Sequence, residues 1–175
     1  MTNRKPYKES CQLLIDWQLL EGDTLPELPP RPPRDDDEQL GVSFFRTKLA
    51  DVQLQSLTLP RTFFGRSEIR AVSFHDTDLS ESNAAWNDFI DVDFSEADLS
   101  RVDLRGSIFK RVNFRGAILR GADLRRTEFR GCTFTDADLT GAKLSRSLLW
   151  FLRLSSAQRR SVDWQSGPGP EPEGG

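Results

Sequence analysis

A five-residue period runs through this chain from Val42 to Ser156 and constrains its fold more than any other feature. Every fifth residue from Phe44 to Leu154 is Leu, Ile or Phe, except Ala84, which makes 23 positions in one register. The residue two places before each of these positions is usually small. A period of five fits neither an α-helix, with 3.6 residues per turn, nor a plain strand, with a period of two. A repeat this strict indicates a solenoid, and solenoids mostly serve as binding surfaces.

A second period of twenty residues lies over the first. One column at this spacing is all leucine: Leu59, Leu79, Leu99, Leu119 and Leu139. Two others are phenylalanine: Phe74, Phe94, Phe114 and Phe134, and then Phe89, Phe109 and Phe129. The pattern therefore predicts a coil with four sides of five residues each and a narrow, dry interior filled by stacked side chains. At a strand spacing of ~4.8 Å, the rod would be on the order of 28 Å long.

The repeat has a recognisable form, in which a small residue and Asp or Asn precede the inward Leu or Phe. It stands as Ala97-Asp98-Leu99, as Ala122-Asp123-Leu124 and as Ala137-Asp138-Leu139. In this it resembles the pentapeptide-repeat family. The resemblance implies an all-β fold, a right-handed, four-sided β-helix of nearly six coils. It also implies a partner class, because some members mimic the charge and width of duplex DNA. Those members bind DNA gyrase and topoisomerase IV, protect them from quinolones, and dimerise through their C-terminal ends.

The flanking residues differ from the repeat and suggest five segments. Residues 1–24 contain a predicted helix at 7–21, with Leu13, Trp17 and Leu20 on one face. Residues 25–41 read as a proline-rich, acidic linker, and 42–156 form the β-helix. A short capping helix is predicted at 157–164, followed by a disordered tail at 165–175. The N-terminal helix either caps the first coil, which a solenoid needs to avoid end-to-end strand pairing, or binds a partner.

Apolar residues occupy outward positions at the C-terminal end of the repeat. They need a cover, either a helix beginning at Ser155 or Ser156 or a second copy of the chain. The candidate cap or homodimer residues are Leu148, Trp150, Phe151, Val162 and Trp164.

The sequence offers no clear catalytic or metal-binding pattern. The single histidine, His75, lies between Phe74 and Asp76 with no second His or Cys near it in the stack. The two cysteines, Cys11 and Cys132, do not indicate a disulfide scaffold, so a reducing cytoplasm is expected. No long apolar run occurs, so no membrane span is expected. We therefore expect a non-enzyme without a cofactor or metal.

Glycines such as Gly106 fall two places after an inward residue, where a corner with positive φ is expected.

Charge is unevenly placed along the rod. Residues 42–100 carry 5 basic and 10 acidic residues, whereas 101–156 carry 12 basic and 5 acidic ones. The basic half contains a regular collar directly after the inward residues, consisting of Arg105, Lys110, Arg115, Arg120, Arg125 and Arg130. The collar can serve solubility by lateral pairing with Asp103, Asp123 and Glu128, or it can bind nucleic acid or an acidic protein.

One coil departs from the pattern and yields a candidate interaction patch. Ala84 replaces the large inward residue, Asn87 replaces the small one, and Trp86 and Ile90 point outward. At twenty-residue spacing these two share columns with arginines and a lysine, which gives the patch Trp86, Ile90, Arg66, Arg70, Lys110 and Arg130. An exposed Trp rimmed by arginines has the composition of a binding hot spot. Alternatively, Trp86 folds back over the void that Ala84 leaves.

Three functions are consistent with these residues. The first is a scaffold or protein-interaction module that uses the rod surface, with an unidentified protein partner. The second, implied by the resemblance, is DNA mimicry directed at gyrase or topoisomerase IV. An acidic face would carry it: Asp76, Asp78, Glu81, Asp91, Asp93, Glu96 and Asp98. The basic second half argues against mimicry over the full length. The third, nucleic-acid binding through the collar, lacks an aromatic ladder for base stacking.

Overall fold

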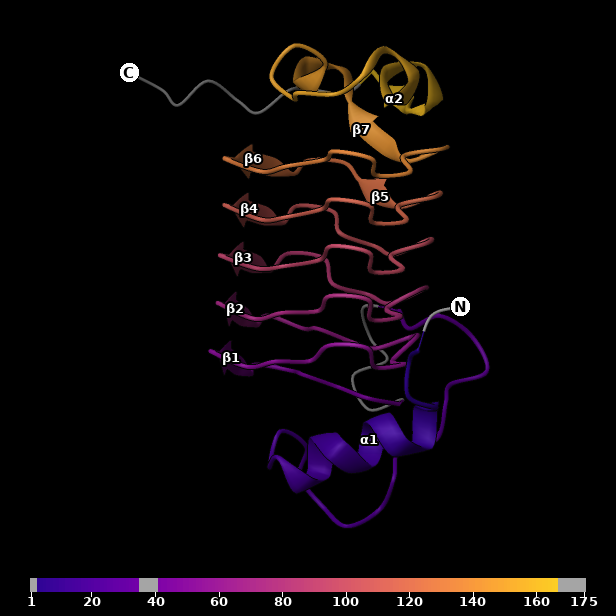
Figure 1. The fold of residues 1–175 in the computed structure, drawn as a ribbon, viewed down its shortest axis with the longest axis vertical. Helices are drawn as coiled ribbons and strands as arrows, with labels where there is room; N and C mark the ends of the chain where they lie inside the picture. The colour runs from indigo at the N-terminus through magenta and orange to yellow at the C-terminus, as the bar shows by residue number, and fades with distance from the viewer. Residues whose placement is uncertain (1–2, 35–40, 167–175) are drawn as a thin grey trace.

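The five-residue period builds a stack of flat coils in which twenty residues complete one coil (Figure 1). The computed structural model describes residues 3–34 and 41–166. In this part of the chain, one parallel sheet has the order β1-β2-β3-β4-β6. Its strands are β1 (Lys48–Ala50), β2 (Glu68–Arg70), β3 (Asp88–Ile90), β4 (Ile108–Lys110) and β6 (Glu128–Arg130). A second sheet has the order β5-β7-β8, formed by β5 (Asp123–Leu124), β7 (Lys143–Ser145) and β8 (Asp163–Gln165).

The register of both sheets is twenty residues, as the sequence predicts. Leu49 pairs with Ile69, and Phe89 pairs with Phe109. The inward side chains therefore stack in columns along the axis. The rings of Phe74 and Phe94 are 5.3 Å apart and within 9° of parallel. Neighbouring columns meet edge to face, which fills the interior with apolar contacts. The predicted β-solenoid is confirmed.

The corners of the coil lie two residues after each inward side chain and have positive φ. Gly106 adopts a φ of 67°, as expected for glycine, but Trp86 adopts 60° at the equivalent corner. Left-handed backbone is unfavourable for residues with a Cβ. It recurs here because backbone hydrogen bonds to the neighbouring coils fix each corner, as when Trp86 N donates to Arg105 O over 2.9 Å.

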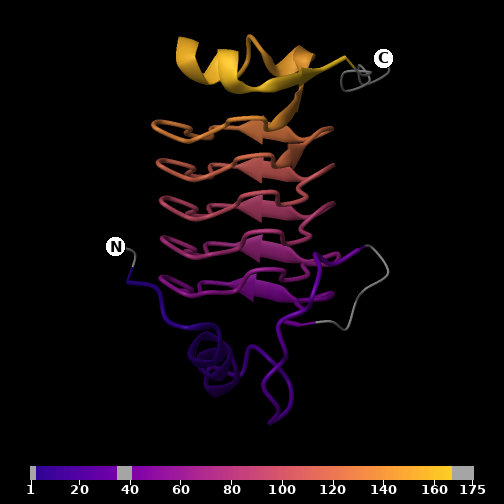
Figure 2. The same ribbon diagram turned by 90° about the vertical axis from the view of Figure 1, so that its right-hand side faces the viewer.

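Helix α1 (Tyr7–Asp16) lies across the first coil (Figures 1 and 2). It is shorter than the predicted 7–21, and its buried face consists of Ser10, Cys11 and Leu14. The prediction of a face through Trp17 was wrong, because the helix ends at Asp16 and the Trp17 side chain is exposed. Ser10 joins the helix to the coil, since its Oγ accepts a 2.9 Å hydrogen bond from Thr58 N.

The described part of the linker, residues 25–34, packs against the rod. Pro29 and Pro33 are buried, and Arg61 Nη1 donates a hydrogen bond to Pro29 O over 2.5 Å. This segment is therefore held to the first coils. The acidic run at 35–40 lies outside the described residues, as does the predicted disordered tail beyond residue 166.

The regular coil ends earlier than the predicted residue 156. A 3₁₀ helix, η1 (Arg146–Leu148), follows β7, and Leu148 packs against the core there. Helix α2 (Ser156–Ser161) starts with Ser155 as its N-cap in a capping box with Gln158. The predicted helix to Trp164 is wrong in its last turn, because Trp164 lies in β8 and pairs with Leu144.

Helix α2 covers the open carbonyls of the last coil. Gln158 Nε2 donates to Phe134 O over 2.7 Å and to Ala137 O over 2.9 Å. An uncovered terminal coil would leave these groups free to pair with another chain. The rod is thus bounded by α1 at one end and by α2 at the other (Figure 2).

Candidate interaction surface

Trp86 projects from a corner of the rod with 60% of its surface exposed. Its ring lies against Gly106 on the next coil: a Cβ at position 106 would be 2.2 Å from Trp86 Cε3. The void beside Ala84 persists inside the rod as an apolar cavity of about 10 Å³, and Trp86 does not line it. The interpretation that Trp86 folds back over this void is therefore wrong, and the absence of a side chain at Gly106 is what seats the indole.

Asn87 explains how this corner is held. Its side chain is buried, its Oδ1 accepts from Ser67 N over 2.6 Å, and its Nδ2 donates to Phe64 O over 2.5 Å and to Ala85 O over 3.1 Å. One carboxamide thus joins the corner that carries Arg66 to the corner that carries Trp86. A buried amide that makes all of these hydrogen bonds stabilises the fold, and removing it would leave buried backbone groups without hydrogen-bond partners. Ser107 makes two corresponding bonds one coil further on, where its Oγ accepts from Asn87 N and donates to Ala84 O.

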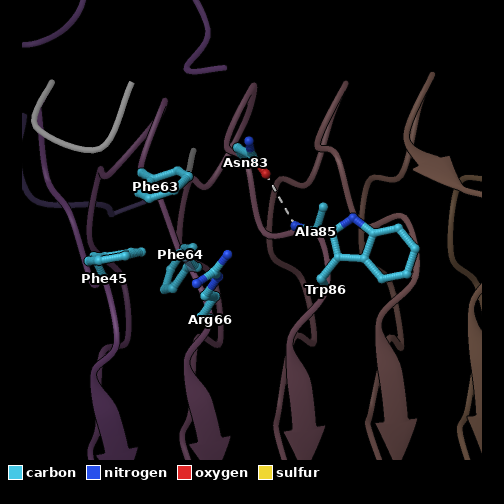
Figure 3. A pocket seen from close by; sticks show the side chains of 8 residues that line it. Phe45, Phe63, Phe64, Arg66, Asn83, Ala85 and Trp86 are labelled. Atoms are coloured by element: carbon cyan, nitrogen blue, oxygen red, sulfur yellow. Dashed lines mark hydrogen bonds between the residues drawn. The ribbon is translucent and has the colours of Figure 1, made fainter. Parts of the chain in front are cut away.

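A surface hollow of about 300 Å³ opens between Trp86 and the two coils below it (Figure 3). Its lining consists of Phe45, Phe63, Phe64, Gly65, Arg66, Asn83, Ala85 and Trp86. Gly65 makes room for two phenylalanines, because a Cβ there would lie 2.5 Å from Phe63 Cε1 and 2.6 Å from Phe45 Cδ2. The hollow is at the lower end of the size of ligand pockets, about 300–1,000 Å³, so it suits one or two side chains.

Positive charge borders this hollow, and none of its described lining residues is an Asp or Glu. Arg66 is exposed, and among the residues that the structure describes it forms no ion pair. The Arg46 guanidinium lies over the Phe45 ring, 5.0 Å from its centroid. The outward columns 45–65–85–105–125 and 46–66–86–106–126 contain no Asp or Glu. We name this surface, formed by Arg46, Phe45, Phe63, Arg66 and Trp86, the Trp86 corner.

The other members of the sequence-predicted patch lie elsewhere. Ile90 pairs in register with Arg70 and Lys110 on the β1-β2-β3-β4-β6 sheet, as the twenty-residue spacing predicts. Neither they nor Arg130 line the hollow. Arg70 also pairs with Glu68 over 3.4 Å. The structure therefore brings Trp86 and Arg66 together and leaves Ile90, Arg70, Lys110 and Arg130 in a separate column.

The repeat pattern did not single out Phe45, Phe63 and Arg46. The two phenylalanines each neighbour an inward phenylalanine, in Phe44-Phe45 and Phe63-Phe64, and were overlooked beside the repeat itself. The available signal was the outward column at twenty-residue spacing, where Phe45 is followed by Gly65 and Ala85. A large residue followed by two small ones in a stacked column indicates a hollow.

Most of the basic collar is engaged in ion pairs. Arg105 pairs with Asp103 over 2.6 Å, Arg125 with Asp123 over 2.6 Å, Arg130 with Glu128 over 3.2 Å, and Arg120 with Asp138. Burial alone would raise the pKa of Asp123, but the hydrogen bonds and charge of Arg125 outweigh it and lower that pKa. In the described ranges, Lys110 and Arg115 form no ion pair. The collar thus shows the predicted lateral pairing with Asp103, Asp123 and Glu128.

The acidic set is divided among several corners, and much of it is neutralised. Arg4 Nε lies 3.1 Å from Asp76 Oδ1 and 2.7 Å from Asp76 O. Glu81 pairs with Arg101 over 2.9 Å, and Arg111 holds Asp91 and lowers the pKa of its carboxyl. The remaining side chains turn to the coil surface. Asp78 and Asp98 accept from backbone N–H groups two residues on, Asp93 accepts from Asn113, and Glu96 lies over Gly116.

At the C-terminal end, the five candidate residues have two environments. Val162 is buried, and Leu148 and Trp164 pack against the core. Trp150 and Phe151 are 82% and 81% exposed, and the Arg159 guanidinium lies 5.7 Å from the Trp150 ring centroid. Val162, Leu148 and Trp164 therefore close the end of the rod, whereas Trp150 and Phe151 face solvent.

The described residues show no arrangement suited to metal binding. His75 Nδ1 lies 2.9 Å from Ser95 Oγ, while Asp76 is held by Arg4. No group of three or more His, Cys, Asp or Glu side chains within residues 3–34 and 41–166 could hold a metal ion. No helix in the same residues is long and apolar enough to span a membrane.

Comparisons with known proteins agree with this architecture. The family described as pentapeptide repeats matches residues 69–111, 88–126 and 107–146, with 8 copies. A solved pentapeptide repeat protein of the Arabidopsis thaliana thylakoid lumen is 30% identical with a TM-score of 0.57, covering 59% of this chain and 72% of that one. HetL from the cyanobacterium Nostoc, involved in heterocyst differentiation regulation, is 23% identical with a TM-score of 0.56 and covers 59% of this chain.

The chain spans about half of HetL, 49% of its length. QnrB1, a plasmid-mediated fluoroquinolone resistance protein, is 15% identical with a TM-score of 0.30, covering 67% of this chain and 86% of that one. That TM-score is too low to support a functional argument. No curated protein matches the sequence. With its repeat, its twenty-residue register and these likenesses, the chain belongs to the pentapeptide-repeat family.

Proposed function

We propose that this protein is a non-enzymatic interaction module that binds a protein partner through the Trp86 corner. The observation that carries the proposal is an indole 60% exposed, seated on Gly106, on a corner fixed by Asn87. It lies beside Arg66, which forms no ion pair with any residue that the structure describes. Trp and Arg are the residues most enriched at binding hot spots. Holding them on a rigid coil lowers the entropy lost on binding.

Affinity capture with quantitative mass spectrometry tests this function. The bait is the full chain, compared with Trp86→Ala and with Trp17→Ala, which removes a second exposed indole directly after the end of α1. We expect a partner that is lost with Trp86→Ala and kept with Trp17→Ala, while the Tm of both variants stays near wild type. A lower Tm for Trp86→Ala with every partner retained would assign Trp86 to packing and refute the proposal.

Topoisomerase binding is a second candidate, supported by one observation. Asp78 and Asp98 are paired in register, and Asp76 and Glu96 occupy corners twenty residues apart beside them. These carboxylates, of which Asp76 is paired with Arg4, form an acidic edge along part of the rod. A gyrase supercoiling assay with and without a quinolone tests it. The candidate requires inhibition or drug rescue that is lost in Asp78→Asn with Asp98→Asn, and no effect at micromolar protein removes it.

We also propose a homodimer through Trp150 and Phe151 and a cytoplasmic location. The two aromatic side chains lie side by side in sequence and are almost fully exposed at the end of the rod. Burying both would contribute several kcal/mol, about 1.5–3 for each large apolar side chain. Analytical ultracentrifugation should show a dimer that becomes a monomer in Phe151→Ser, and a wild-type monomer would rule the contact out.

The proposed cytoplasmic location is supported by the cysteines. Both are free, which suits a reducing compartment.

A further inference from the structure

We infer that the Trp86 corner binds an acidic protein segment through one apolar or aromatic side chain placed in the hollow. Arg66 pairs with a carboxylate next to that side chain. The inference rests on the proposed function and names the class of partner that the surface accepts.

The shape of the hollow favours a single side chain. Phe45 and Phe63 form one wall, with ring centroids 6.2 Å apart. Trp86 borders the opposite side, with its ring turned toward Gly106 on the next coil (Figure 3). Gly65 and Ala85 form a floor that is already packed and buried. Aromatic walls around a shallow apolar floor stabilise a bound ring or aliphatic group by stacking and by burial of its surface. A volume of about 300 Å³ leaves no room for a folded element.

The charge at the rim favours carboxylates. Arg66 and Trp86 stand on adjacent coils in one column, with Arg46 below Arg66 and Arg126 two coils above Trp86. Arg46, Arg66 and Arg126 form no ion pair within residues 3–34 and 41–166, in contrast to the paired collar arginines. A guanidinium without a carboxylate partner can form bidentate bonds with an incoming acid. The two outward columns 45–65–85–105–125 and 46–66–86–106–126 carry no carboxylate that would repel this acid.

The same contacts disfavour a nucleic acid. A phosphate backbone needs cations along its length. Four of the six collar residues that would extend the contact are already paired with carboxylates at positions 103, 123, 128 and 138. These carboxylates would lie next to the phosphates. The hollow also adds an apolar site that a phosphate backbone does not use. A short acidic segment contacts only the unpaired arginines and fills the hollow.

Fluorescence anisotropy with a defined peptide tests the inference. The probe is a fluorescein-labelled nonapeptide with a central phenylalanine and two acidic residues on each side. One control peptide replaces the phenylalanine by serine, and a second replaces the acids by their amides. A 20-base-pair DNA duplex and an oligothymidylate of equal length are the nucleic-acid probes. Titrations use the full chain at two salt concentrations, since exposed ion pairs weaken as salt rises.

The variants separate the hollow from general charge. Arg66→Gln removes the unpaired guanidinium, and Arg115→Gln removes one charge from the collar at a site without an ion pair among the described residues. Gly106→Ala displaces the indole without altering it, because of the 2.2 Å approach to Trp86. Gly121→Ala is its matched control: its φ of 65° is nearly the same as that of Gly106, but its nearest neighbour, Arg101 Cγ, is 3.5 Å from the added Cβ.

We expect a dissociation constant below about 100 μM for the acidic phenylalanine peptide and about tenfold weaker binding for each control peptide. Arg66→Gln, Trp86→Ala and Gly106→Ala should each weaken binding about tenfold, and Arg115→Gln and Gly121→Ala should leave it unchanged. Equal loss in Arg66→Gln and Arg115→Gln, or tighter binding of either nucleic acid, overturns the inference. Failure of the peptide while Trp86→Ala still loses a captured partner refutes this partner class alone. Failure in both assays refutes the proposed function as well.

Discussion

Replacing Asn87 by alanine tests how the Trp86 corner is built. The substitution removes three hydrogen bonds, to Ser67 N, Phe64 O and Ala85 O, with lengths of 2.6, 2.5 and 3.1 Å. Each is worth about 1 kcal/mol net, and a buried group left without a partner costs about 1–3 kcal/mol. The Ser67 amide and the Phe64 carbonyl lie next to buried side chains, where water cannot replace the lost partner. We therefore expect Asn87→Ala to lower the free energy of unfolding by about 3 kcal/mol.

Urea denaturation followed by circular dichroism measures this change, with Val92→Ala as the control. Val92 fills the equivalent small slot on the next side of the same coil and is 2% exposed. Its truncation removes two methyl groups without touching a hydrogen bond and should cost about 2 kcal/mol. If Asn87→Ala costs no more than Val92→Ala at an unchanged m value, the carboxamide does not hold the corner and the reasoning is refuted.

Two further predictions concern the corner glycine and an ion pair. Gly106→Ala should lower the Tm more than Gly121→Ala and should shift tryptophan emission, because only a Cβ at position 106 meets Trp86, at 2.2 Å. Equal Tm changes for the two variants in differential scanning fluorimetry would contradict the packing of Trp86 on Gly106. The pKa of Asp123 is lowered by Arg125, so its stabilising contribution is present above the ordinary carboxyl pKa of ~3.9 and is lost as pH falls through the lowered value. Between pH 5 and pH 2.5 the Tm of the wild type should therefore fall further than that of Asp123→Asn, and parallel curves would argue against the pair.

The rod could be predicted in detail because one physical requirement repeats along it. Every inward residue meets the residues twenty positions before and after it, so stacking such as Phe89 on Phe109, with centroids 5.1 Å apart, follows from spacing alone. The positive-φ glycines at the corners are predicted by the same five-residue period, because they lie two residues after an inward side chain. Lateral pairing of Arg105 and Arg125 with neighbouring acids follows too, since their partners stand two residues away.

The ends of the rod could not be predicted to the same degree, because contacts distant in sequence decide them. The helix at residues 7–16 buries Cys11 and Leu14 against a coil more than forty residues away, and no local period reveals that orientation. Arg4 reaches Asp76 across 72 residues. Trp164 resumes the twenty-residue register after a helix, which a pattern confined to the continuous repeat does not anticipate.

The candidate site was predicted only in part for a related reason. Trp86 departs from the repeat, and Arg66 follows from the column twenty residues before it, but the hollow depends on outward residues of three coils. Phe45 and Phe63 close over Gly65, and Asn87 fastens the corners from inside. Neither contact follows from the identity of a single residue.

Site-specific photo-crosslinking tests the central claim, binding at the Trp86 corner, most directly. A benzophenone amino acid replaces Glu68, an exposed residue two positions after Arg66 that is not part of the Trp86 corner, or replaces His75 on another side of the rod, in cells of the source organism. The account predicts one protein crosslinked from position 68 and absent from position 75, at similar Tm for both variants. Crosslinking from position 75 alone, or equally from both positions, would contradict it.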